Sequence, residues 1–64
     1  MLSDWEIWAC ANETVRQHGA AATVFAVTRA DELERQGDQA GARTWRLIGA
    51  RIKELLGPPP GDLN

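Results

Sequence analysis

Apolar and polar positions alternate along this chain at helical spacing, in three runs of similar length. Each run ends at a glycine: Gly19, Gly37 or Gly57. Within a run the apolar residues recur at intervals of three and four, which is the period of an amphipathic helix. Glycine readily adopts the left-handed conformation that ends a helix. The pattern therefore predicts an all-α domain of three helices over residues 1–57, followed by a Pro-rich tail over 58–64 that we expect to be disordered.

The first predicted helix runs from Asp4 to about His18, and Ser3 and Glu6 are spaced as in a capping box at its start. Its apolar positions form two neighbouring stripes. The stronger stripe consists of Trp5, Trp8, Ala11, Val15 and Asn12. The weaker stripe consists of Ile7, Cys10 and Thr14. An apolar surface this wide indicates contact with two neighbours instead of one.

The second predicted helix begins at Ala20 and runs to about Gln36. Its first residues are alanines, which offer no side-chain acceptor, so we expect a weakly capped start. Val24 and Val27 lie away from the centre of its inner face. That face is predicted to consist of Ala22, Phe25, Ala26, Ala30 and Leu33.

The third predicted helix runs from Gln39 to about Leu56. Gly37 can end the second helix while Asp38 caps the third, and so short a connection predicts a tight antiparallel hairpin. The core stripe of this helix is predicted to be Gly41, Trp45, Ile48, Ile52 and Leu55. Glycines inside a helix reduce its stability, so Gly41 and Gly49 indicate close approach by a neighbouring helix or indole.

Composition limits the function classes. A chain of 64 residues forms one small domain, and one cysteine and one histidine are too few for a disulfide or a structural zinc site. The net charge of −2 argues against a large phosphate-binding surface. No apolar run reaches membrane-spanning length. We therefore expect a cytoplasmic protein that uses no metal or cofactor, binds no small-molecule ligand and contacts no membrane.

Catalytic groups are scarce. Cys10 and His18 are the one nucleophile–base pair, and eight residues along a helix separate them by about 12 Å. The sequence thus predicts no enzyme, unless a dimer brings the two groups together. The carboxylates Asp31, Glu32 and Glu34 are interpreted as a solvated helix face with arginine partners on the same helix, including Asp31 with Arg35.

The three tryptophans exceed what so small a core easily holds. Trp8 and Trp45 are expected inside, and Trp5 is expected to stay partly exposed beside Leu2 and Ile7. Such a patch is typical of a protein contact surface. The leading prediction is therefore a non-enzymatic interaction module, either a homodimer or a subunit that docks on another protein.

The alternative prediction is a regulatory protein that contacts nucleic acid. Its contacts would come from basic residues on one helix, namely Arg43, Arg46 and Lys53. A recognition helix usually carries more basic residues, with Asn or Gln among them to read bases.

Several of these residues occur together in a known group of sequences. They are Trp8-Ala9-Cys10-Ala11, His18-Gly19, Gly37-Asp38 and Thr44-Trp45, with Ile48, Arg51 and Ile52. On this pattern the chain, from Asp4 to Leu55, resembles a family of short alphaproteobacterial proteins of unknown function. The resemblance implies a compact helical unit. It brings no activity, ligand or site residue with it.

Overall fold

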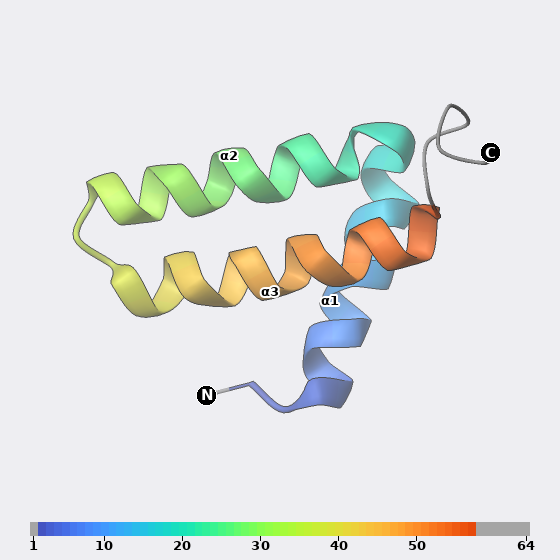
Figure 1. Cartoon of the computed structure of the whole chain (residues 1–64), viewed down its shortest axis with the longest axis horizontal. Helices are drawn as coiled ribbons and strands as arrows, with labels where there is room; N and C mark the ends of the chain where they lie inside the picture. The colour runs from blue at the N-terminus through green and yellow to red at the C-terminus, as the bar shows by residue number, and fades with distance from the viewer. Residues whose placement is uncertain (1, 58–64) are drawn as a thin grey trace, which may run out of the picture.

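The computed structural model describes residues 2–57, which form three α-helices and one 3₁₀ turn, with no strand among them (Figure 1). The elements are α1 (Asp4–His18), η1 (Gly19–Ala21), α2 (Ala22–Arg35) and α3 (Gln39–Leu56). The all-helical prediction is confirmed. The tail predicted over 58–64 lies outside the described residues. No helix within 2–57 has the length and apolar character needed to cross a bilayer.

α1 begins at a complete capping box, as predicted. The backbone N–H of Glu6 donates to Ser3 Oγ, and the backbone N–H of Ser3 donates to Glu6 Oε1 at 2.9 Å. The bond from the Ser3 backbone, and then the bond to its hydroxyl, lower the pKa of Glu6. The first turn of α1 is thus fixed by side-chain bonds before any tertiary contact forms.

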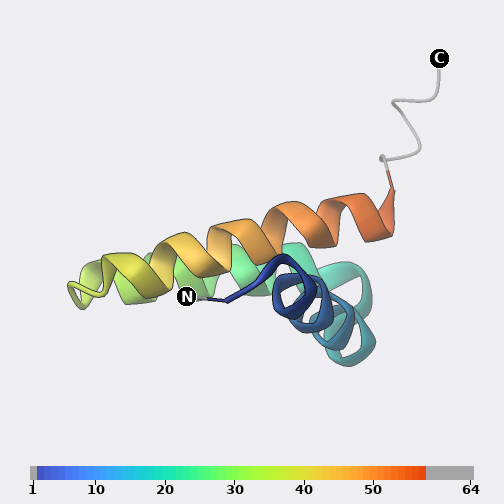
Figure 2. The same ribbon diagram turned by 90° about the horizontal axis from the view of Figure 1, so that it is seen from below.

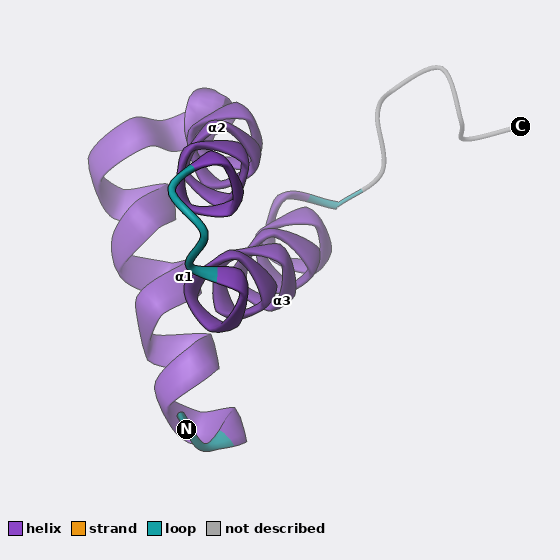
Figure 3. Cartoon of the chain, turned by 90° about the vertical axis from the view of Figure 1, so that its left-hand side faces the viewer, coloured by secondary structure: helices purple, strands orange, loops and turns teal. Residues whose placement is uncertain are grey.

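α2 and α3 lie side by side and antiparallel, joined by residues 36–38 (Figures 1 and 3). Gly37 has a φ of 87°, a backbone conformation that residues with a Cβ rarely adopt. The backbone N–H of Asp38 donates to the carbonyl of Leu33 at 2.8 Å, and Asp38 Oδ1 accepts from the N–H of Gly41 at 2.9 Å. The connection predicted at Gly37-Asp38 is confirmed.

The start of α2 is the weakly capped end that the sequence predicts. Its N-cap is Ala21, which makes no side-chain bond. The structure adds the short turn η1 (Gly19–Ala21), where continuous helix was expected. Gly19 has a φ of 55° and ends α1, so the chain changes direction here before α2 begins.

α1 crosses one face of the hairpin and leaves the other face uncovered, as the two rotated views show (Figures 2 and 3). The core lies at this crossing. Its buried members are Ile7, Ala11, Ala22, Ala26, Ile48 and Ile52, with Cys10, Val15 and Trp45 packed partly buried against them. Nearer the turn, three further residues are buried, namely Ala30, Leu33 and Ala42.

The inner face of α1 corrects the prediction. The buried residues are Ile7, Ala11 and Thr14, whereas Trp5 is 77% exposed and Trp8 only half-buried. The buried side carries the smaller side chains, so α1 lies closer to the hairpin on that side, and the two indoles extend past the contact. The Thr14 hydroxyl is satisfied because it donates to the carbonyl of Cys10 at 2.7 Å.

The inner faces of the hairpin also differ in part from the prediction. Ile48 and Ile52 are buried as expected, but Leu55 is 40% exposed and Phe25 is 39% exposed. Trp45 is half-buried. The two helices meet through alanines and Gly49 instead of through their large side chains. The larger residues are therefore displaced to the edges of the contact.

The two internal glycines of α3 have different explanations. A Cβ at Gly49 would lie 3.5 Å from the Cβ of Ala26, so α2 does approach closely there. A Cβ at Gly41 would lie 2.5 Å from Asp38 Oδ2, which belongs to the capping residue of the same helix. Close approach by another helix is confirmed for Gly49, whereas Gly41 makes room for the cap.

This difference predicts opposite outcomes for two matched substitutions. Gly49→Ala fits at van der Waals distance, so it should raise the free energy of unfolding by about 1 kcal/mol through helix propensity. Gly41→Ala gains the same propensity but displaces the Asp38 cap, which is worth about 1 kcal/mol, so its net effect should be near zero. Urea unfolding followed by circular dichroism measures both. A Gly49→Ala protein less stable than Gly41→Ala would contradict the assignment.

A second pair of variants tests the core. Ile48 is 2% exposed and Leu55 is 40% exposed. Ile48→Ala should lower the free energy of unfolding by about 2–5 kcal/mol, which is most of the stability a domain this small has. Leu55→Ala removes a side chain of equal size from a half-exposed site and should lower it by much less. Equal losses in thermal unfolding would show that the core is misplaced.

Candidate interaction surfaces

Large apolar side chains lie mostly outside the core of this protein. Of the nine buried hydrophobic residues in the described chain, five are alanine. Eight large hydrophobic residues are exposed: Leu2, Trp5, Val24, Phe25, Val27, Leu47, Leu55 and Leu56. A single exposed apolar residue needs no explanation, but a small domain with this distribution has apolar area available for contact.

The most exposed of them lies at the start of α1. Trp5 is 77% exposed and Leu2 is 38% exposed. Asp4 and Glu6, which flank Trp5 in the sequence, are exposed as well. These four residues form what we call the Trp5 surface. The exposure expected for Trp5 is confirmed. Ile7, predicted to belong to the same patch, is instead 6% exposed and part of the core, because it faces the hairpin.

The other indole of α1 is held differently. Trp8 is half-buried, and the guanidinium carbon of Arg51 lies 5.3 Å from its ring centroid. Arg51 also forms an ion pair with Glu54 of the same helix. This cation–π contact joins α1 to α3, so Trp8 has a structural partner that Trp5 lacks among the described residues.

A groove runs along the uncovered face of the hairpin and is lined by α2 and α3 alone. We call it the hairpin groove. Small or apolar residues line it, namely Thr23, Val27, Trp45, Gly49 and Ala50, and two cations flank it, Arg46 and Lys53. The face on which the groove opens follows from helix geometry. Ala50 is two residues from both Ile48 and Ile52, which is a rotation of roughly 200° about the helix axis. It therefore lies on the opposite side of α3 from the residues that pack on α1.

Little in the sequence pattern predicts this groove. Val27 was recognised as lying off the inner face of its helix, and Gly49 as a point of close approach. Neither observation shows that the two helices bring these positions together. The groove arises because the exposed residue beside Gly49 is Ala50, whose short side chain leaves space open on this side of α3.

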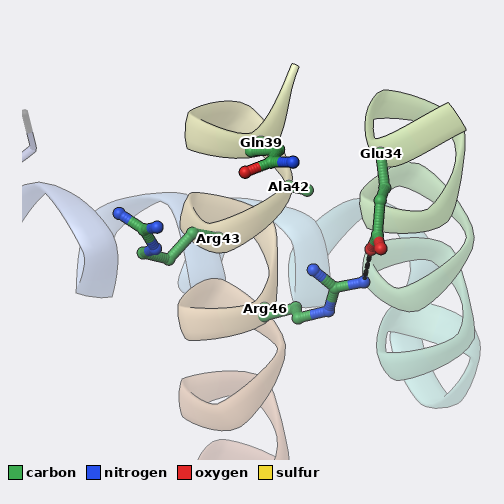
Figure 4. Close-up of a pocket in the computed structure, with 5 residues that line it drawn as sticks. All are labelled: Glu34, Gln39, Ala42, Arg43 and Arg46. Atoms are coloured by element: carbon green, nitrogen blue, oxygen red, sulfur yellow. Dashed lines mark hydrogen bonds and ion pairs between the residues drawn. The ribbon is translucent and has the colours of Figure 1, made fainter. Parts of the chain in front are cut away.

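Closer to the turn, the same face is dominated by charge. Glu34, Gln39, Ala42, Arg43 and Arg46 line a shallow hollow, and Arg46 reaches across it to bind Glu34 (Figure 4). Arg46 also lies 3.7 Å from Asp31. Two carboxylates thus offset its charge. Arg43, Arg46 and Lys53 do lie along one helix, but Arg46 is less available to a phosphate, and nucleic-acid contact stays a prediction.

The acidic cluster of α2 is divided between two partners. Glu32 lies 3.7 Å from Arg29 of the same helix, as the solvated-face interpretation requires. Asp31 and Glu34 pair with Arg46 of α3, and the ion pairs of the described residues do not include the predicted Asp31–Arg35 pair. Within residues 2–57, no three His, Cys, Asp or Glu side chains are grouped so as to hold a metal ion.

A third groove separates α1 from the hairpin and contains both groups of the possible nucleophile–base pair. It is lined by Ala9, Cys10, Glu13, Thr14, Gln17, His18, Phe25 and Trp45. The His18 ring stacks on Phe25 with centroids 4.1 Å apart, and Phe25 meets Trp45 edge-on at 5.7 Å. His18 thus has a packing role that joins α1 to α2, in agreement with the packing or capping role that its position at the end of the helix predicts.

The exposed side of α1 that borders this groove carries a short charged network. Arg16 donates to both carboxylate oxygens of Glu13, and Gln17 donates to Glu13 Oε2 at 2.7 Å. The bonds from Arg16, and then the bond from Gln17, lower the pKa of Glu13 from 4.5 to about 2. The same contacts raise the pKa of Arg16.

This network predicts an acid dependence of stability. The pKa of Glu13 is lower in the folded chain, so its contribution is complete above pH 4.5 and is lost as the pH falls towards about 2. A carboxyl-detected NMR titration of Glu13 should show a midpoint near 2. Arg16→Ala should move that midpoint back towards 4.5, and an unchanged midpoint would rule out the pairing.

Comparison with known proteins gives one match. Neither a search of curated proteins nor a search of solved structures returned a significant similarity. A family model described as "Family of unknown function (DUF6961)" matches residues 3–57, which is most of the chain and spans all three helices. This agrees with the resemblance seen in the sequence motifs. The chain therefore belongs to the DUF6961 family.

Proposed function

We propose that this protein is a non-enzymatic interaction module that binds a protein partner through the Trp5 surface. The observation that carries the proposal is the position of Trp5, whose indole is 77% exposed in the first turn of α1. Tryptophan is enriched among the residues that dominate binding energy in protein interfaces. An exposed indole on a small domain is therefore better explained as a contact than as a structural group.

The local structure favours binding because it holds the indole in place. The capping box of Ser3 and Glu6 fixes the first helical turn, so the Trp5 backbone is ordered before a partner arrives. A contact group that is already ordered loses less conformational entropy on binding. The flanking carboxylates of Asp4 and Glu6 add a charge preference, which favours a partner with an apolar pocket and a basic rim.

The remaining chemistry supports binding over catalysis. Cys10 and His18 are separated by two helical turns, and the His18 ring is stacked against Phe25. A single cysteine per chain also suits the reducing conditions of the cytoplasm, where we propose that the module acts.

The proposal predicts that binding depends on Trp5 and not on exposed apolar residues in general. Val24 is 67% exposed on α2 and provides a matched control. The full chain, Trp5→Ala and Val24→Ala should be compared for partner capture from the native host. Affinity for any partner should then be measured with purified proteins. We expect Trp5→Ala to weaken binding at least ~30-fold, the effect of a residue that dominates an interface.

Helix content measured by circular dichroism should be the same for all three proteins, because Trp5 is outside the core. If no protein, a second copy of this chain included, loses affinity on Trp5→Ala relative to Val24→Ala, the proposal is wrong.

A further inference from the structure

We propose that the partner of the Trp5 surface is the hairpin groove of a second copy of this chain. This inference rests on the proposed function and names the occupant of the interface. Each protomer would then offer both its own Trp5 and its own groove to other copies.

The lining of the groove includes positions with little or no side chain. Gly49 contributes no side chain to it, and Ala50 beside Gly49 is short and exposed. A neighbouring ring can therefore approach α3 closely at Ala50. Val27, which is 51% exposed, provides an aliphatic contact from α2. Trp45 also lines the groove, while its indole meets Phe25 edge-on.

The charges that flank the groove also suit an indole. Lys53 and Arg46 lie on the same side of α3, and a cation near the face of tryptophan is attracted to its ring. Arg46 is already bound to Glu34 and lies near Asp31. Lys53 is therefore the cation that the groove offers to an incoming acidic group.

The Trp5 surface is complementary to this arrangement. Asp4 and Glu6 flank Trp5 in the sequence, and both are exposed. The bonds from Ser3 lower the pKa of Glu6. An acidic rim on one surface and Lys53 on the other give the charge complementarity that orients two proteins on encounter. An apolar anchor and an apolar groove then meet at the centre.

The fold requires that the two surfaces come from different copies. α1 lies across one face of the hairpin (Figures 2 and 3). The groove is lined by α2 and α3 alone, and Ala50 points away from the side of α3 that packs on α1. Trp5 cannot reach the groove of its own chain without α1 leaving the core. The contact therefore joins two different surfaces. If it is reciprocal it closes as a two-fold dimer, and otherwise it adds further copies unless its rotation closes a larger ring.

Complementation between two variants tests this arrangement. Trp5→Ala removes the anchor and keeps the groove. Ala50→Glu fills the groove, adds repulsion towards Asp4 and Glu6, and keeps the anchor. Ala40→Glu makes the same change at another exposed position of α3, outside the groove, and is the matched control. Mass is measured by sedimentation equilibrium from micromolar to millimolar concentration, with helix content checked for every variant.

We expect the mass of the full chain and of Ala40→Glu to rise with concentration to at least twice the monomer value of 7.0 kDa. Trp5→Ala and Ala50→Glu should each stay monomeric. Their equimolar mixture should form a one-to-one dimer and grow no further, because only one anchor and one groove remain intact between them.

Three outcomes would overturn the inference. A mixture that stays monomeric shows that anchor and groove do not meet. An Ala50→Glu protein that still associates through Trp5 shows that the contact does not use the groove, and leaves the proposed function standing. A full chain that stays monomeric throughout excludes a second copy as the partner, whereas the proposed function then depends on Trp5-dependent binding of a different protein.

Discussion

The contact on which this structure depends is the close approach of α2 and α3 at Ala26 and Gly49. The Cβ of Ala26 lies 3.5 Å from where a Cβ of Gly49 would be. The separation of two packed helices is set by the side chains at their contact, so residues this small bring the axes close. The short turn at Gly37 and the cap at Asp38 then hold the pair antiparallel. Any residue larger than alanine at Gly49 would separate the helices and open the core.

Small residues at the contact determine where the large ones lie. Five of the nine buried hydrophobic residues are alanines, and Phe25, Trp45 and Leu55 are displaced to the edges of the helix pair. α1 covers only one side of the hairpin, through Ile7 and Ala11. The apolar surface that remains is therefore a consequence of how the core is built. It is the physical basis of the proposed interface.

Sequence reasoning was reliable where the signal is local. The three glycine boundaries, the capping box at Ser3 and the connection at Gly37-Asp38 depend on neighbours within a few residues, and all are found in the structure. The prediction was wrong about the inner face of α1, because this helix has two apolar stripes. The hairpin packs against the side of α1 that has the smaller side chains, and this depends on contacts between helices. The hairpin groove was not foreseen because it needs the register of two helices at once.

The central claim is that apolar groups left outside an alanine-rich core form an interface, with Trp5 as its anchor. The most direct test is to follow the indole N–H signals of Trp5, Trp8 and Trp45 by NMR in a dilution series of the full chain. If the claim is correct, the Trp5 and Trp45 signals move together with one concentration midpoint, while Trp8, beside Arg51, stays constant. A Trp5 signal that is unchanged up to millimolar concentration would contradict self-association through Trp5.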